Sequence, residues 1–279
     1  MDAYMIFIDN SENGIDDETL EEFEKQLGDG KADNLYLIIK SGGGSPFSSV
    51  AMMNILDSRF TKISTIIPEY AKSAATLMAL GTDKIYMSEK SALGPLDLPT
   101  EHHRDGSRIS ALDIKNTITT MASLIESIAE NRFDFLRKRS IPKKESAQFS
   151  LENATDFLKP IVSQIDPYHL QKAHRELRIG QWYAIDMLSR RMMKGKPNQV
   201  RKTTNALVNS FPAHEYSIFS NDAKEMLHLT IEDLNKLDIW NKELKVIYNG
   251  FRKKSFHIQY GIIKNDATNL QTTKKGNKK

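Results

Sequence analysis

The first hundred residues alternate short apolar runs with stretches of helical character. The runs are rich in β-branched residues and read as strands buried on both faces. Between the runs, Leu20, Phe23 and Leu27 share one helical face, and two further stretches have helical composition. The expected strands are residues 5–8, 35–39, 63–67 and 84–87, and the expected helices 16–27, 46–56 and 74–80. This order predicts an α/β fold with a mostly parallel sheet and right-handed crossovers.

After Asp97 the apolar residues recur at helical spacing, and the segments that show this spacing are longer. A polar loop at 101–106 precedes expected helices at 109–139, 169–193 and 200–211. A last short strand at 217–219 and a helix start at 221–227 follow. We therefore expect one domain over residues 1–263, with a helical oligomerisation region at about 107–211, and a disordered basic tail at 264–279.

Composition narrows the function classes. The 279 residues include no cysteine, which excludes disulfides, thiolate zinc sites and cysteine nucleophiles. The net charge of +3 is small, and lysines of the tail supply much of it, so no nucleic-acid partner is indicated. No apolar stretch approaches the roughly 20 residues that cross a bilayer, and no basic-then-apolar signal opens the chain. A cytoplasmic protein without an integral membrane segment is expected.

One serine stands at the turn between a predicted strand and the next helix. Ser73 lies in Glu69-Tyr-Ala-Lys-Ser-Ala-Ala-Thr-Leu77, after the apolar run 63–67. A hydroxyl at such a turn rises out of the sheet beside the free N–H groups of the helix start, as several hydrolases present a nucleophile. A serine that only caps the helix would give the same pattern. Both interpretations stay open on these residues alone.

A glycine turn occupies the corresponding place after an earlier strand. Ser41-Gly-Gly-Gly44 follows the run 35–39. Because the carboxyl ends of parallel strands share one edge, this turn and Ser73 are expected to meet there. An N–H group from each turn would form an oxyanion hole, worth roughly 3–4 kcal/mol per donor in acyl transfer. A phosphate-binding loop is less favoured, since neither Lys-Ser/Thr nor Gly-x-Gly-x-x-Gly follows.

Three segments together resemble the serine dehydrogenase proteinase family, relatives of signal peptide peptidase A and of the Clp protease proteolytic subunit. They are residues 38–44, 70–77 and 91–97, and the resemblance continues in order through 211–218 and 221–225. It implies a Clp/crotonase fold, a spiral of ββα units with a mostly parallel sheet and additional C-terminal helices. It also implies serine peptidase activity and ring or stacked oligomers.

Carried over by position, the resemblance assigns the nucleophile to Ser73 and the following oxyanion N–H to Ala74. Gly43 and Gly44 fall on the glycine pair that supplies the other donor, with the choice between them open. The Clp subunit has a histidine before a Gln-Pro, where this chain reads Leu96-Asp-Leu-Pro99. It has its aspartate before a helix start, where this chain has His214. The sequence thus departs from the Clp order of the triad.

Three candidates for the base that activates Ser73 follow. His214 comes first because an imidazole titrates near neutrality, and Asp97 would then orient it, with the two roles exchanged in chain order. Lys72 comes second because related peptidases use a Ser-Lys dyad, although adjacent residues point apart. Its other interpretation is a charged residue at a rim or interface. Asp97 acting alone is the third.

The sequence therefore predicts a serine peptidase that forms an acyl-enzyme at Ser73 and takes peptide or unfolded-protein substrates as a homo-oligomer. The alternatives are an inactive Clp-like scaffold that binds peptides or a partner protein, and a crotonase-type acyl-CoA enzyme. No cofactor is expected. No metal is expected either, because no histidine and carboxylate set has helix-face spacing. His102 and His103 belong to the polar loop that could overlie the site.

Overall fold

The computed structural model describes residues 2–9, 14–97, 99–101 and 108–263. Its centre is a nine-stranded sheet that is mostly parallel. The strands β1 (Asp2–Asp9), β2 (Ala32–Ser41), β3 (Phe60–Ile67), β5 (Lys84–Met87) and β10 (Ile231–Asp233) run parallel in that order. On the other side of β1, β11 (Phe256–Ile263) pairs antiparallel along the whole strand.

The sheet changes partners at the carboxyl end of β2. There Ser41 pairs with Ala71 of β4 (Tyr70–Ala71), although most of β2 pairs with β3. From β4 the sheet continues through β6 (Ala92–Leu93) to β9 (Ile218–Phe219), which is antiparallel. This step turns the edge of the sheet and brings β4 and β6 to the place where β2 ends.

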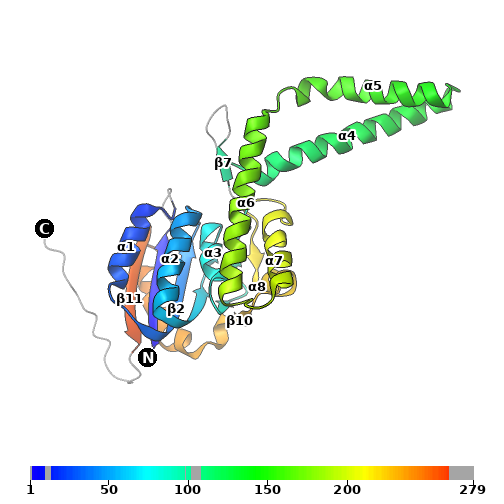
Figure 1. The fold of residues 1–279 in the computed structure, drawn as a ribbon. Helices are drawn as coiled ribbons and strands as arrows, with labels where there is room; N and C mark the ends of the chain where they lie inside the picture. The colour runs from blue at the N-terminus through cyan, green and yellow to red at the C-terminus, as the bar shows by residue number, and fades with distance from the viewer. Residues whose placement is uncertain (1, 10–13, 98, 102–107, 264–279) are drawn as a thin grey trace.

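Helices cover both faces, so alternate residues of each strand enter different cores. One face carries α1 (Asp17–Leu27), α2 (Pro46–Arg59), α3 (Ala74–Leu80), α6 (Pro167–Arg190) and α7 (Pro197–Asn209) (Figure 1). The other face is covered by η1 (Leu234–Lys236), the π-helical turn η2 (Trp240–Leu244) and α9 (Lys245–Phe251). In β1, for example, Met5 and Phe7 enter the first core, and Ile6 and Ile8 the second.

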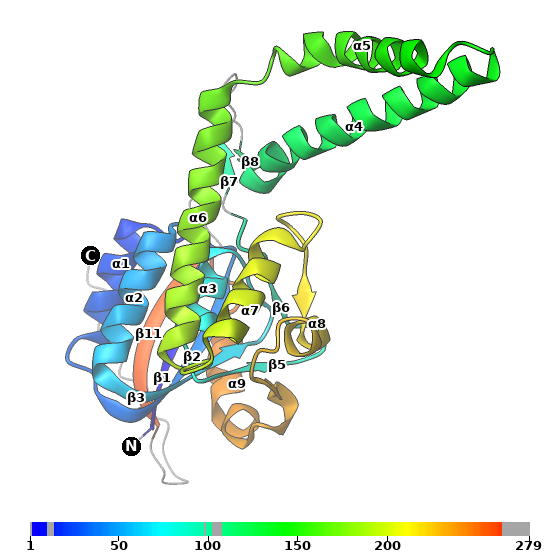
Figure 2. The same cartoon turned by 45° about the vertical axis from the view of Figure 1, so that its right-hand side comes forward.

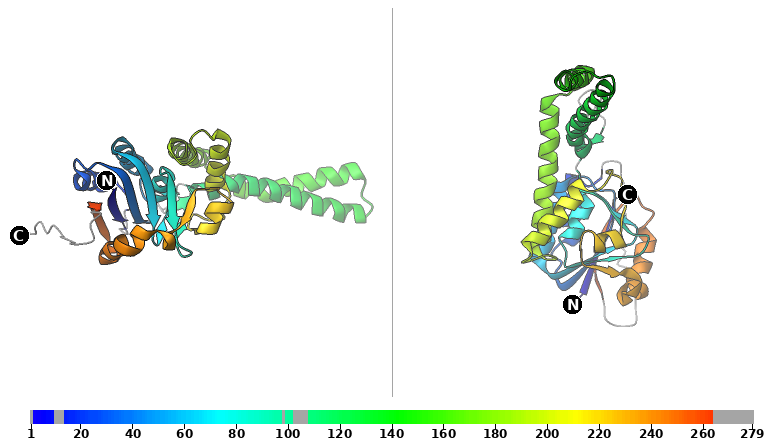
Figure 3. Two further views of the ribbon diagram at one scale, coloured as in Figure 1. Left: turned by 90° about the horizontal axis from the view of Figure 1, so that it is seen from below. Right: turned by 90° about the vertical axis from the view of Figure 1, so that its right-hand side faces the viewer.

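Two long helices form an arm that leaves the body of the molecule. They are α4 (Ala111–Lys138) and α5 (Lys143–Val162), which pack against each other and project beyond the sheet (Figure 2). At the base of the arm, β7 (Pro99–Glu101) and β8 (Arg108–Ser110) form a two-stranded ribbon. The views from below and from the side show the arm clear of the body throughout its outer half (Figure 3). None of the described helices is long and apolar enough to cross a bilayer.

The α/β class and the mostly parallel sheet are confirmed. The segment 74–80 and the segment 84–87 have the predicted bounds, and α2 and β3 extend a few residues beyond theirs. Several elements were missed, among them several short strands, the helix α9, the long helix α5 and the edge strand β11. The helix α5 buries a stripe of mostly small residues, and the edge strand β11 alternates weakly, so neither presents a clear apolar period. The predicted tail from Lys264 and the histidines His102 and His103 lie outside the described residues.

Candidate active site

Ser73 occupies a strained turn between β4 and α3. Its φ of 47° and ψ of −118° fall in a region that residues with a side chain rarely adopt. The residue stands in the N-cap position, yet its hydroxyl makes no capping hydrogen bond. An ordinary N-cap serine has an extended backbone and accepts from the helix. The geometry therefore does not match a simple cap, and the 4% exposure of Ser73 puts it in a recess.

The glycine turn lies directly against this serine. A Cβ on Gly43 would stand 2.8 Å from the Cβ of Ser73 and 2.7 Å from the carbonyl oxygen of Lys72. Gly43 also has a φ of 101°, so both the close approach and the backbone require glycine. The N–H of Gly43 donates to Ser41 Oγ at 3.0 Å, and its carbonyl accepts from the N–H of Ile15 at 2.7 Å. The turn is thus fixed by hydrogen bonds on both sides.

The N–H groups at this junction that have no acceptor in the part of the chain that the structure describes include those of Gly44 and of Ala74, the first residue of α3. The Ala74 nitrogen would lie 3.1 Å from a Cβ built on Gly43, so the two turns are in contact at this point. Because the first N–H groups of a helix have no intrahelical partner, such a junction suits a negatively charged oxygen.

An imidazole and a buried carboxylate form a second part of the site. His214 Nδ1 lies 3.0 Å from Asp97 Oδ1, across 117 positions of sequence. The Asp97 side chain is 2% exposed, and Ser110 Oγ donates to its other oxygen at 2.7 Å. Since a carboxylate accepts, Nδ1 carries the proton and Nε2 is the basic nitrogen. The hydrogen bond and charge of Asp97 raise the pKa of His214 above its ordinary value, against the opposing effect of burial.

Lys72 connects the serine turn to the segment that carries the imidazole. Its Nζ donates to Ser217 Oγ at 2.8 Å, to the Tyr216 carbonyl at 2.9 Å and to the Glu215 carbonyl at 3.4 Å. Burial lowers the pKa of its ammonium group, partly offset by Glu215. The same segment is held a second time, because the Tyr216 ring stacks on Phe211 with centroids 5.2 Å apart. Residues 214–217 are therefore fastened beside residue 72.

The structure brings the seven candidate residues to one region, with one connection missing. No hydrogen bond between Ser73 Oγ and His214 is found among the described residues. The serine with its glycine turn and the His214–Asp97 pair are instead linked through Lys72.

The sequence did not single out two hydroxyl residues that support the site. Thr76 Oγ1 donates to the Ala71 carbonyl at 2.8 Å and accepts from the N–H of Gly94 at 3.1 Å, which ties α3 to the strand leading to Asp97. Ser110 both caps α4 and holds Asp97. Ser110 falls at the second position of the expected helix 109–139, where a serine is a usable signal for an N-cap, but no pattern pointed to Thr76.

Within the described residues, no group of three or more histidine, aspartate or glutamate side chains is placed to hold a metal ion. The chemistry available from this set is that of a serine hydroxyl, an imidazole backed by a carboxylate, and backbone N–H donors. That combination is suited to acyl transfer.

Comparison with known proteins also indicates a serine proteinase. Residues 12–138 match the family described as ClpP-like SDH-type serine proteinase. Two proteins of Methanocaldococcus jannaschii match parts of the chain. Uncharacterized protein MJ0137 is 34% identical over 79 residues, 28% of this chain and 28% of its own. Uncharacterized protein MJ1495 is 27% identical over 124 residues, 39% of this chain and 42% of its own. The chain thus spans less than half the length of each of these relatives.

Two solved structures are similar over about half of the chain. Both are mutants of the membrane-bound stomatin-specific protease 1510-N. The mutant in complex with a substrate peptide is 18% identical to this chain, with a TM-score of 0.31. The similarity covers 49% of this chain and 68% of the chain in that structure. The other is 15% identical with a TM-score of 0.29, and covers 47% of this chain and 61% of its own.

Proposed function

Residues 12–138 belong to the family of ClpP-like SDH-type serine proteinases, and from this premise we propose that the chain is a serine peptidase that forms an acyl-enzyme at Ser73. The observation that carries the proposal is the strained serine turn. Ser73 has a positive φ, makes no capping hydrogen bond, and lies against a glycine turn that excludes any side chain. Strain of this kind persists only where the surroundings impose it, and it gathers at functional sites.

The oxyanion donors in this proposal are the N–H groups of Gly44 and Ala74. Gly43 is the less suitable of the two glycines because its N–H already donates to Ser41. In the described part of the chain, the Gly44 and Ala74 N–H groups lack an internal acceptor, so neither would have to give up a hydrogen bond to bind the developing charge.

His214 acts as the base in this proposal, with Asp97 as its orienting partner. The Ser73 oxygen attacks the carbonyl carbon of the peptide bond while its proton passes to His214 Nε2. The carbon–nitrogen bond then breaks, and the same proton goes to the leaving amine. Water repeats the sequence on the acyl ester: His214 takes its proton, the ester bond breaks, and Ser73 recovers its hydroxyl proton.

Lys72 takes a positioning role rather than that of the base. A base must accept a proton, whereas the Lys72 ammonium donates to two carbonyl oxygens and one hydroxyl. Through these bonds it holds the His214 segment next to the nucleophile. Catalytic hydrogen bonds are often absent before substrate binds, so the missing Ser73–His214 bond is expected to form in the complex.

One experiment separates this function from its rival. Wild type, Ser73→Ala and His214→Ala are incubated with a fluorophosphonate probe and with an unfolded protein substrate. We expect labelling and cleavage by wild type, neither by Ser73→Ala, and a rate lowered by about 10³-fold or more for His214→Ala. Equal turnover by wild type and Ser73→Ala would contradict the nucleophile, and full activity of His214→Ala would contradict the base.

The rival is an inactive scaffold that binds peptides or a partner protein. One observation favours it: within the described residues, Ser73 is 4% exposed and has no hydrogen bond to His214. Wild type that binds an unfolded peptide but stays unlabelled by the probe would establish this alternative.

Self-association belongs to the same proposal. On α5, three of the four buried side chains are serine or alanine, whereas large apolar residues face outward on both helices of the arm. These exposed residues are Ile118, Leu124, Phe135, Phe149, Leu151, Phe157, Ile161 and Val162. An apolar surface of this extent is typical of a protein contact rather than of a solvated helix. We propose that the arm contacts further copies of the chain.

A further inference from the structure

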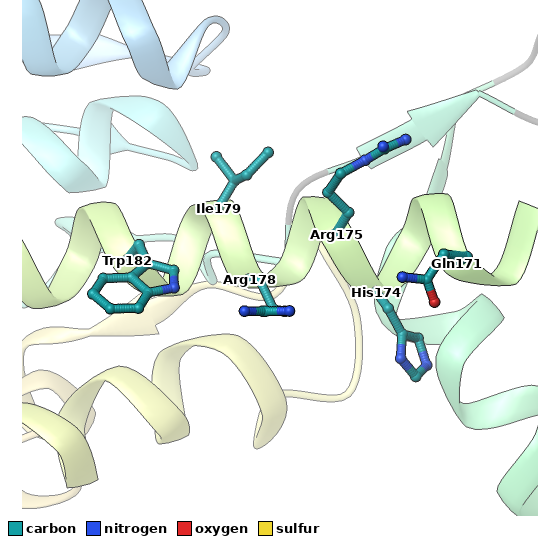
Figure 4. A pocket seen from close by; sticks show the side chains of 6 residues that line it. All are labelled: Gln171, His174, Arg175, Arg178, Ile179 and Trp182. Atoms are coloured by element: carbon teal, nitrogen blue, oxygen red, sulfur yellow. The ribbon is translucent and has the colours of Figure 1, made fainter.

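The outer side of α6 presents cations beside an exposed tryptophan. Six residues of this helix line an open cavity of about 440 Å³, and Figure 4 shows the side chains of all six projecting from the helix. They are Gln171, His174, Arg175, Arg178, Ile179 and Trp182. The Trp182 residue is 66% exposed, which is unusual for the largest apolar side chain. We call these residues the α6 stripe.

The arginines of the stripe lack acidic partners in the described part of the chain. No ion pair involves Arg175 or Arg178 there, whereas Arg190, on the same helix, pairs with Asp57 and Asp186. Tryptophan and arginine are the residues most enriched at the energetic centres of protein interfaces. A guanidinium group also binds carboxylates in a bidentate way that lysine cannot match. The stripe therefore suits a partner with carboxylates in a row.

Such a row exists on the arm of this same protein. Glu126, Glu130 and Asp134 follow one another at intervals of four on α4, and all three are exposed. Successive carboxylates at this spacing lie about 6 Å apart along one helix face, and like charges so placed destabilise a helix. No ion pair involves them among the residues described. We call these three residues the α4 stripe.

The two stripes of one chain are separated by the direction of the arm. The α4 stripe begins 15 positions beyond the start of α4, so it lies roughly 22 Å or more along a helix that leads away from the body. The α6 stripe lies beside the first turns of α4, since His174 and Arg178 line a cavity together with Lys115, and beyond that point α4 leads away from α6 (Figure 2). Each copy therefore carries two complementary surfaces that it does not itself pair.

We infer that the α6 stripe of one copy binds the α4 stripe of a second copy. Because different surfaces of the two copies meet, the contact closes either reciprocally in a two-fold dimer or head-to-tail in rings or chains, and the mass in solution distinguishes the two. Arg175 and Arg178 pair with the carboxylates, and Trp182 packs against the arm of the neighbour. This inference specifies the surfaces of the proposed self-association and does not depend on peptidase activity.

Charge reversal tests the inference directly. The mass in solution is measured by sedimentation equilibrium for wild type, R175E/R178E, E126K/E130K and a chain carrying all four changes. All these positions are exposed, and circular dichroism checks that each variant is folded. The matched control is R201E/K202E, which makes the same charge change at exposed positions of α7.

Each pair of reversals should weaken association at least about tenfold, since like charges then face each other. The chain with all four changes, and a one-to-one mixture of the two double variants, should recover the wild-type mass. Wild-type association should weaken between about 0.05 M and 0.5 M salt. The control should behave as wild type.

The inference is overturned if R175E/R178E keeps the wild-type mass, or if the four changes together fail to restore it. In those cases self-association through another surface still stands. A wild type that stays monomeric overturns both the inference and the proposed self-association. Probe labelling of Ser73 tests the peptidase proposal separately.

Discussion

Replacing Lys72 by methionine should uncouple the His214 segment from the serine turn. Methionine keeps the length and the apolar stem of the side chain but removes all three donor contacts to residues 215–217. The prediction is a loss of positioning rather than a loss of the fold.

The contacts set the size of the effect on stability. The two shorter ones, of 2.8 and 2.9 Å, are hydrogen bonds from a charged donor, each worth about 1.5–3 kcal/mol. Two terms reduce this sum. The ammonium no longer has to be desolvated, and Glu215 and Tyr216 are exposed, so water can reach their carbonyls. We expect the free energy of unfolding in urea to fall by about 1–2 kcal/mol.

The effect on catalysis should be larger. A displacement of about 1 Å in a catalytic group can lower the rate about 10²-fold, so kcat/KM for an unfolded substrate should fall by that factor. The pKa of His214, followed by NMR, should also fall toward its ordinary value as the Asp97 contact weakens. Removing a nearby cation would by itself raise that pKa, so the sign separates lost positioning from lost charge.

Two variants control this experiment. Lys72→Arg can donate to the same oxygens and should recover most of the His214 pKa and the activity. Lys62→Met removes an exposed lysine of β3 and should change neither. The positioning role of Lys72 is excluded if Lys72→Met leaves the His214 pKa unchanged and kcat/KM within about threefold of Lys62→Met, a difference below 1 kcal/mol.

Three further predictions test other parts of the site. Asp97→Asn should lower the pKa of His214, so the rise of kcat/KM with pH should move to lower pH while its plateau falls by about 10⁴-fold; a pH profile with an unmoved midpoint would contradict the pairing. The raised pKa of His214 in the folded state also stabilises the protein. This stabilisation is fully present below the unfolded pKa of about 6.5 and is lost as pH rises through the folded pKa. Asp97→Asn should abolish this pH dependence of the free energy of unfolding in urea. Gly43→Ala should destabilise by about 2–5 kcal/mol, because a side chain there meets Ser73 and φ is 101°; a melting temperature equal to wild type would show that the turn is more adaptable than described. Thr76→Val should lower the free energy of unfolding by about 1–3 kcal/mol by leaving Gly94 N–H unpaired, with Thr76→Ser as the control that keeps the hydroxyl.

The local elements of the first hundred residues could be predicted from the sequence. Short β-branched runs can be told from helices because burial on both faces leaves a continuous apolar pattern. The turn before α3 was also visible, since Ser73 is followed by a helix of small residues. The glycine turn could be matched to it because parallel strands share an edge. These features depend on neighbours in the chain, and local composition reports them directly.

Tertiary structure alone decided how the distant parts meet. The antiparallel pairing of β11 with β1, the His214–Asp97 bond and the Lys72 contacts join residues more than a hundred positions apart. A polar residue such as Lys72 has the same local pattern whether it is solvated or bound to a carbonyl. The projection of the arm is decided in the same way, because α5 buries mostly serine and alanine against α4 and leaves its phenylalanines outside. Periodicity shows that a helix has an apolar face, but only the packed chain shows which face is covered.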